Sequence, residues 1–151
     1  MTIYALSTVQ GQSGVAIIRV SGPLAEEAIF KLTHKKLKPR MATLCKILNS
    51  KKEALDEAVV IFFEEKRSFT GESVAEFQTH GGEAIIRSVL KELSLIKGLR
   101  PAEPGEFTKQ AYLSGKINLV QAEGLGDLIS AQTEKQRQQA MMQYGDETSN
   151  K

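Results

Sequence analysis

The chain has 151 residues, 41% of them hydrophobic, which suits one domain of ordinary size with a core of its own. Its 20 basic and 18 acidic residues give a net charge of only +2. A single cysteine, Cys45, excludes an intrachain disulfide framework and fits a reducing compartment. No signal peptide opens the chain and no apolar run approaches the length of a membrane span, so we expect a cytoplasmic protein without membrane contact.

The charge is unevenly distributed. Residues 1–50 carry a net charge of +5 and the remainder −3, with most of the excess in residues 31–40. Such a basic segment can attract a phosphate backbone. A solvated helix end and loop has the same composition, and no RNA-binding aromatic signature interleaves the lysines, so we expect the solvated loop.

The first half of the chain alternates strand and helix signals. Residues 3–8 are typical of a strand, and the β-branched run at 15–20 predicts a strand buried on both faces. A helix is expected after residues 21–23, because their proline suits a first helical turn. Two further strands are predicted on either side of Lys51–Lys52, the first of them holding Cys45 as a buried structural thiol.

The second half adds a strand at 74–79 and a helix at 85–96, whose apolar residues repeat at helical spacing. A short helix is expected over residues 105–113, and a capping box at 118–121 begins another helix. Mixed strands and helices of this kind predict an α+β, sandwich-like domain in which one sheet is packed with helices.

We expect this domain to span residues 1–117. The helix that begins at residue 118 loses its apolar stripe early and has no neighbour left in the sequence to cover it. Residues 118–151 are therefore predicted to be the start of a truncated helical domain with a disordered tail.

Three charged residues are candidates for ligand binding. Arg19 ends an apolar strand, where it either emerges at a sheet end, pairs with a core acid, or binds a ligand carboxylate or phosphate. Glu76 alternates with apolar residues on its strand and either faces solvent or accepts adjacent N–H groups of a heterocycle such as a pterin. Lys116 follows Gly115 in a break between helices and is either an exposed loop lysine or a partner for a ligand's acidic tail.

Other motifs carry less chemistry. His80-Gly81-Gly82 precedes a helix whose first N–H groups could receive an anion, although a tight strand-to-helix turn explains the glycines equally well. No His/Cys/Asp cluster has metal-ligand spacing, so we expect no metal site. Neither a G-x-x-x-x-G-K-[ST] loop nor a nucleophile–base arrangement is present. We therefore expect no catalytic residues, and no GTP or ATP hydrolysis by this chain alone.

Five motifs stand in a fixed order along the chain: GVAIIRVSGP at 14–23, FTGE at 69–72, HGG at 80–82, PGEFT at 104–108 and GK at 115–116, with QAE at 121–123 behind them. Their order and spacing, from residue 2 to about residue 135, resemble the N-terminal domain of the tRNA-modification GTPase family called MnmE or TrmE. The resemblance covers nearly the whole chain.

The resemblance implies a fold related to folate-dependent aminomethyltransferases, a constitutive homodimer, and binding of 5-formyltetrahydrofolate or a related tetrahydrofolate. The family's folate contacts fall on Arg19, Glu76 and Lys116 in this sequence. Our allocation sets Glu76 against the pterin edge, and Arg19 and Lys116 against polar or carboxylate groups.

In the full-length family a helical domain follows, with an inserted GTPase domain that uses GTP, Mg²⁺ and K⁺. Together with the FAD-dependent partner MnmG (GidA), the family modifies the wobble uridine (U34) of certain tRNAs, and folate is the proposed one-carbon donor. We therefore expect this chain to be the folate-binding and dimerising domain of such a GTPase, without the GTPase domain itself.

The chain departs from the family at several positions. Ser73 stands where Asp is usual, and residues 110–114 read QAYLS where the family usually has RAFLN. A structural dimerisation module that has lost folate binding is therefore an alternative. A free-standing folate-dependent one-carbon transferase is a third, but no acid–base constellation supports it.

Overall fold

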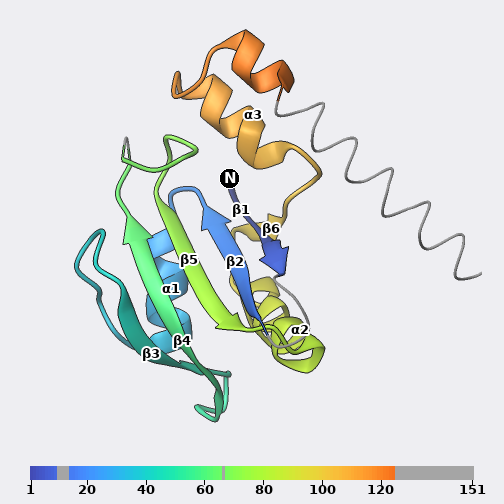
Figure 1. The fold of residues 1–151 in the computed structure, drawn as a ribbon. Coiled ribbons are helices and arrows are strands. Elements are labelled where there is room, and N and C mark those ends of the chain that lie inside the picture. The colour runs from blue at the N-terminus through green and yellow to red at the C-terminus, as the bar shows by residue number, and fades with distance from the viewer. Residues whose placement is uncertain (10–13, 66, 125–151) are drawn as a thin grey trace, which may run out of the picture.

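The described part of the chain forms one six-stranded mixed β-sheet with helices packed against it (Figure 1). The structure is a computed structural model that describes residues 1–9, 14–65 and 67–124. The strands are β1 Thr2–Val9, β2 Val15–Ser21, β3 Thr43–Leu48, β4 Ala54–Phe63, β5 Val74–His80 and β6 Leu99–Pro101. The helices are α1 Ala25–Thr33, α2 Glu83–Ser94 and α3 Glu106–Leu113.

The strand order across the sheet is β3-β4-β5-β2-β1-β6. Neighbouring strands are antiparallel except β1 and β6, which are parallel. The connection from β5 through α2 to β6 therefore passes over β2 and β1 on one face of the sheet. This architecture confirms the predicted α+β class of one mixed sheet packed with helices.

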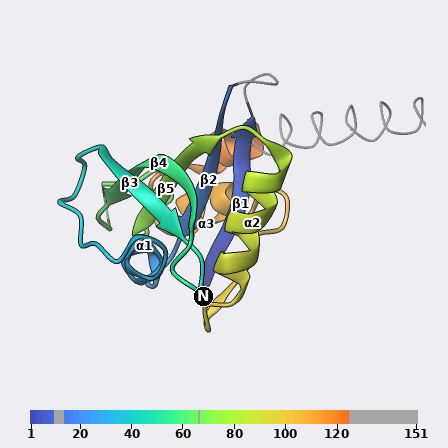
Figure 2. The ribbon, with the colours of Figure 1, turned by 90° about the horizontal axis from the view of Figure 1, so that it is seen from below.

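Helices α1 and α2 cover the same face of the sheet, as the view from below in Figure 2 shows. The core lies between them and the sheet, because the amphipathic face of each helix faces inward. Ala28, Ile29 and Leu32 of α1 and Val89 and Leu93 of α2 are at most 1% exposed. They pack against the inward side chains of the central strands, among them Ile18, Val20, Val60, Ala75 and Phe77.

The prediction that the strand at 15–20 is buried on both faces was wrong. Ala16, Ile18 and Val20 are buried against the helices, whereas Ile17 and Arg19 on the other face are partly exposed. A β-branched run predicts a strand but not how many faces are covered, and here α1 and α2 cover only one. We call the other side the open face of the sheet; its central side chains are Ile17 and Arg19 of β2, Glu76 and Gln78 of β5, and Val59 and Ile61 of β4.

Strand β3 holds Cys45, which is 1% exposed and packs in the core, so the predicted buried thiol is confirmed. Burial raises the pKa of the Cys45 thiol, and the nearby charge of Lys35 lowers it by a smaller amount. Strand β6 was not predicted. It has three residues and ends in Pro101, so neither its length nor its composition stands out in the sequence.

The predicted capping box is confirmed. The Asn118 backbone N–H donates to Gln121 Oε1 at 2.9 Å, and the Gln121 N–H donates to Asn118 Oδ1 at 2.8 Å. The helix that follows is described only as far as Gly124. The rest of the segment predicted as a truncated helical domain with a disordered tail lies outside the described residues, so the division at residue 117 stays a prediction.

Candidate functional site

Arg19 and Glu76 form an ion pair at the centre of the open face. They are direct cross-strand partners in the β2–β5 register, which places both side chains on the same side of the sheet. Arg19 Nη2 lies 3.0 Å from Glu76 Oε1, and the two side chains are 21% and 18% exposed. Two of the three predicted site residues are therefore in contact on rigid elements.

Two phenylalanine rings flank the guanidinium of Arg19. The Arg19 Cζ atom lies 5.8 Å from the ring centroid of Phe69, in the segment between β4 and β5, and 5.6 Å from that of Phe107 on α3. Both distances are within the range of cation–π attraction. The Nε atom of Arg19 is buried and has no hydrogen-bond partner among the described residues. A buried donor without an acceptor is costly, so an incoming acceptor here would be favoured.

A chain of hydrogen bonds fixes the FTGE segment to the sheet and to α3. The Glu72 backbone N–H donates to Thr70 Oγ1 at 3.3 Å, Thr70 Oγ1 and Ser21 Oγ are 2.7 Å apart, and Ser21 Oγ donates to Gln110 Oε1 at 2.6 Å. Because Ser21 has only one hydroxyl proton and gives it to Gln110, Thr70 is the donor to Ser21. Every hydroxyl in this buried chain therefore both donates and accepts.

Gly71 allows the FTGE segment to approach the end of α3. Its φ of +80° is in the left-handed region, and a Cβ atom at this position would lie 2.4 Å from Ser114 Cβ and 3.2 Å from Lys116 Cγ. The Gly71 N–H also donates to Ser68 Oγ at 3.1 Å. Lys116, the third predicted site residue, therefore lies against the same segment that carries Phe69.

The PGEFT turn positions α3, and with it Phe107. Arg100 holds Glu106 through two guanidinium nitrogens, one of them Nη1, which lies 2.7 Å from Glu106 Oε1. The same oxygen accepts the Glu103 N–H at 2.9 Å. The hydrogen bond from Arg100, supported by that from Glu103, lowers the pKa of Glu106 from 4.5 to about 2 despite its partial burial. The pair ties the first turn of α3 to β6 at neutral pH.

The HGG motif lies at the end of β5 and supports a strand-to-helix turn. A Cβ atom at Gly81 would lie 2.6 Å from the Gly14 carbonyl oxygen, which accepts the Gly81 N–H at 2.8 Å. His80 Nδ1 lies 2.6 Å from Asp56 Oδ1, and the His80 N–H donates to Asp56 Oδ2 at 2.9 Å. The described residues contain no group of three or more His, Cys, Asp or Glu side chains that could hold a metal ion.

Sequence reasoning did not identify five residues of this site individually: Ser21, Phe69, Thr70, Phe107 and Gln110. Four of them lie inside or directly after motifs that were recognised as patterns, so the motifs gave the location but not the role. Gln110 was noted only as a departure from the usual sequence. Its part in the hydrogen-bond chain depends on how α3 packs, which the sequence does not show.

The fold and this site define an α+β domain with a charged pair, bracketed by aromatic rings, on the sheet face opposite α1 and α2. The profile of the family described as "GTP-binding protein TrmE N-terminus" matches residues 2–116, and the chain belongs to this family. It corresponds to the N-terminal region of the tRNA modification GTPases named MnmE.

Three relatives illustrate the similarity. The chain is 51% identical over 143 residues to the mitochondrial 5-taurinomethyluridine-[tRNA] synthase subunit GTPB3 of Danio rerio, covering 94% of this chain and 29% of the relative. It is 49% identical over 144 residues to the tRNA modification GTPase MnmE of Parvibaculum lavamentivorans, covering 94% and 33%. For the human mitochondrial GTPB3 subunit the identity is 48% over 149 residues, covering 97% and 30%. The chain thus spans about a third of the length of these relatives.

No helix in the described part of the chain is long and apolar enough to cross a membrane. The names of the zebrafish and human relatives place those proteins in mitochondria. The expected cytoplasmic location therefore remains a prediction for this chain.

Proposed function

We propose that this domain binds a tetrahydrofolate derivative of the 5-formyl type at Arg19, Glu76 and Lys116. In this proposal the folate is the one-carbon donor for modification of the wobble uridine of tRNA. The observation that carries the proposal is the Arg19–Glu76 ion pair, held on adjacent strands and flanked by Phe69 and Phe107.

The residues present fit such a ligand. A carboxylate on a rigid strand is the right acceptor for the adjacent N–H donors of an amino-pyrimidinone ring. The buried Arg19 Nε without an acceptor provides a donor for polar or carboxylate groups of the ligand. The rings of Phe69 and Phe107 hold the guanidinium by contacts that do not require Glu76, so Arg19 would stay in place when Glu76 takes up the ligand.

The alternative, a dimerisation module that has lost folate binding, was based on the substitutions at 110–114. The contacts of Gln110 and Ser114 argue against a collapsed site. Gln110 accepts the Ser21 hydroxyl, and Ser114 packs against Gly71 beside Lys116. Both substituted residues therefore make contacts with the segments next to the charged pair, which supports retention of binding.

We further propose that the domain forms a homodimer through the β3–β4 side of the open face, beside the Arg19–Glu76 site. Several apolar side chains there have no cover from α1 or α2, with Leu44 59% exposed and Ile17, Val59 and Ile61 partly exposed. An apolar sheet face of this kind is usually covered in the working protein. The family resemblance implies that a second copy of the chain covers this face. We also propose, from the same resemblance, that the fold is related to that of the folate-dependent aminomethyltransferases.

The wider activity belongs to the longer protein. There we expect a GTPase domain using GTP, Mg²⁺ and K⁺, and joint action with the FAD-dependent MnmG on tRNA. The family description names a GTP-binding protein and the MnmE relatives are named tRNA modification GTPases, which supports this assignment.

Isothermal titration of 5-formyltetrahydrofolate into the chain tests the proposal, with light scattering in the same buffer to give the oligomeric state. We expect saturable binding that Glu76→Ala abolishes without changing the mass of the dimer. Glu26→Ala, which removes an exposed carboxylate from α1, is the matched control and should bind as the wild type does. Absence of binding by a well-folded dimer would favour the structural module instead.

A further inference from the structure

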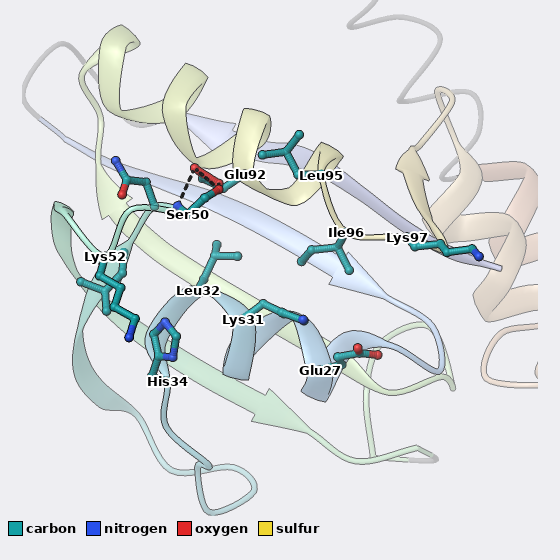
Figure 3. A pocket seen from close by; sticks show the side chains of 12 residues that line it. Glu27, Lys31, Leu32, His34, Ser50, Lys52, Glu92, Leu95, Ile96 and Lys97 are labelled. Atoms are coloured by element: carbon teal, nitrogen blue, oxygen red, sulfur yellow. Dashed lines mark hydrogen bonds between the residues drawn. The ribbon is translucent and has the colours of Figure 1, made fainter.

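A second candidate site lies on the opposite side of the sheet, in a groove of about 500 Å³ between α1, α2 and the β3–β4 turn (Figure 3). Its apolar lining includes Leu32, Leu95 and Ile96, of which Leu95 is 62% exposed. The groove shares no lining residue with the Arg19–Glu76 site.

Basic side chains from three separate elements surround this groove. Lys31 and His34 come from α1 and its C-cap, Lys52 from the β3–β4 turn, and Lys97 from the end of α2. Figure 3 shows His34 and Lys52 at one end of the groove, Lys97 at the other, and Lys31 between them. None of these lysines takes part in the four ion pairs among the described residues.

Two acidic residues also line the groove, and one of them is already engaged. The Glu92 carboxylate accepts the Ser50 N–H at 3.1 Å and the Ser50 hydroxyl at 3.0 Å. These bonds occupy both carboxylate oxygens and fasten the β3–β4 turn to α2. Because the Ser50 groups are uncharged, Glu92 keeps its negative charge, and three lysines against Glu27 and Glu92 give the groove a net charge of +1 with His34 neutral, which favours an anion.

Two residues that line the groove have a left-handed backbone conformation. Three non-glycine residues in the described part of the chain have a positive φ, namely His34 (57°), Arg40 (64°) and Lys52 (64°). Glycine or asparagine adopts this conformation at lower cost. All three positions instead carry a basic side chain, and two of them line the groove.

The helix ends offer a competing explanation for two of the lysines. Lys31 is in the last turn of α1, and Lys97 follows α2 closely, where a cation stabilises the helix dipole. That explanation does not extend to Lys52, which lies in a β-turn. It also does not explain why the Phe30 side chain is 53% exposed, with its ring centroid 6.0 Å from that of His34.

We propose that this groove binds the phosphate backbone of an RNA strand. Lys31, Lys52 and Lys97 are the phosphate contacts, and the Phe30–His34 ring pair is available to an unpaired base. The ring surface favours RNA over an acidic peptide, which would use only the charges. The choice of RNA rests on the proposed role in tRNA modification, whereas the groove itself does not depend on folate binding.

The test measures binding of a fluorescein-labelled tRNA transcript with a wobble uridine to the full 151-residue chain, by anisotropy between 50 and 200 mM salt. The variant carries Lys31→Gln, Lys52→Gln and Lys97→Gln. The control removes the same charge elsewhere through Arg67→Gln, Arg87→Gln and Lys109→Gln. We expect the groove variant to raise the Kd at least about tenfold and to lower the salt slope by about 2, and the control to change the Kd less than about threefold.

Equal weakening by the groove variant and the control would overturn the proposal, as would no tRNA binding at 50 mM salt. If oligoglutamate, added at the same concentration of negative charges as the tRNA phosphates, displaced the labelled tRNA, the groove would be an acidic-peptide site instead. Folate titration of the groove variant separates this inference from the proposed function, because its folate affinity should equal that of the wild type.

A single substitution, Lys52→Gly, tests tRNA binding without the risk that the variant fails to fold. Lys52→Gly removes a charge and also relieves the positive φ, so it should leave the melting temperature unchanged or higher while raising the Kd for tRNA about threefold. A lower melting temperature with unchanged tRNA affinity would mean that Lys52 serves only the turn, which contradicts the proposal.

Discussion

Gly71 and Ser114 approach each other so closely that no side chain fits between them. A Cβ atom on Gly71 would lie 2.4 Å from Ser114 Cβ and 2.8 Å from its Oγ. This contact joins the FTGE segment to the C-terminal end of α3. Phe69 belongs to the FTGE segment, and Phe107 lies in the first turn of α3. The two aromatic rings that flank Arg19 are therefore held in place by the same close approach.

Gly71→Ala is expected to destabilise the fold by about 1–3 kcal/mol, because it adds a steric overlap to a positive φ. The measurement is the free energy of unfolding in urea. Gly124→Ala is the control, since no atom lies within 4 Å of a Cβ there. Adding Ser114→Gly to Gly71→Ala should restore part of the loss by removing the overlap. A Gly71→Ala variant as stable as Gly124→Ala would contradict the assignment.

The Arg19–Glu76 pair should contribute to stability as a coupled unit. Because about four fifths of each side chain is buried, Arg19→Met or Glu76→Gln alone leaves a desolvated group without its partner. Each single change is expected to cost about 1–2 kcal/mol, and the double variant less than the sum.

Urea unfolding of all four proteins completes this cycle. The exposed pair of Arg87 and Glu83, at 74% and 86% exposure, is the comparison, and Glu83→Gln should cost less than about 0.5 kcal/mol. Additive costs for Arg19 and Glu76 would show that their contact is not energetically coupled.

The sequence predicted where the elements lie better than how they pack. The strands at β1, β2 and β5 and the helix at α2 follow from apolar periodicity, which is a local property of the chain. That α1 and α2 pack against only one face of β2 is a tertiary property, which no local pattern reports. Strand β6 could not be predicted either, because it is short and ends in proline. Only its pairing with β1, a tertiary contact, makes it a strand.

The candidate site shows the same division. Arg19 and Glu76 were recognised as charges on apolar strands, but their contact arises from the β2–β5 register. Lys116 is 40 positions beyond Glu76 in the sequence, and its place beside Gly71 follows from the packing of α3. Residues 31–40 were expected to form a solvated loop because no aromatic RNA-binding signature interleaves their lysines. That Lys31 and His34 share a groove with Lys52 and Lys97 follows from tertiary packing.

Thr70→Val should weaken the attachment of the FTGE segment. Thr70 is fully buried, and its hydroxyl both accepts the Glu72 N–H and donates to Ser21. Valine has nearly the same shape but removes the acceptor of the Glu72 N–H and the donor to Ser21, so we expect a loss of about 1–3 kcal/mol. Thr43→Val, at a partly exposed site with one hydrogen bond to the Met41 carbonyl, is the control and should be near neutral.

Hydrogen exchange distinguishes a local effect from a general one. Amide protons of α3 should exchange faster in Thr70→Val, because Gln110 is the last member of the hydrogen-bond chain. Amide protons of α2 should be unaffected. Equal acceleration in both helices would mean that the chain does not hold α3 specifically.

The ion pair of Arg100 and Glu106 predicts a defined acid sensitivity. The folded-state pKa of Glu106 is about 2, against an ordinary value of 4.5, so the unfolded chain binds the proton more readily. The stability that this carboxylate contributes is therefore fully present above about pH 5 and is lost as the pH falls from 4.5 toward 2. Glu106→Gln removes that contribution at every pH, so the stability difference between wild type and variant should shrink over this window.

Thermal unfolding of wild type and Glu106→Gln between pH 2 and 7 measures the difference. Arg100→Met is the second variant, because removing the guanidinium should return the pKa of Glu106 toward its ordinary value and abolish the same window. A difference that stays constant from pH 7 to 2 would contradict the assignment. If the difference instead closes above about pH 6, another carboxylate is responsible, since Glu106 is almost fully ionised in both states there.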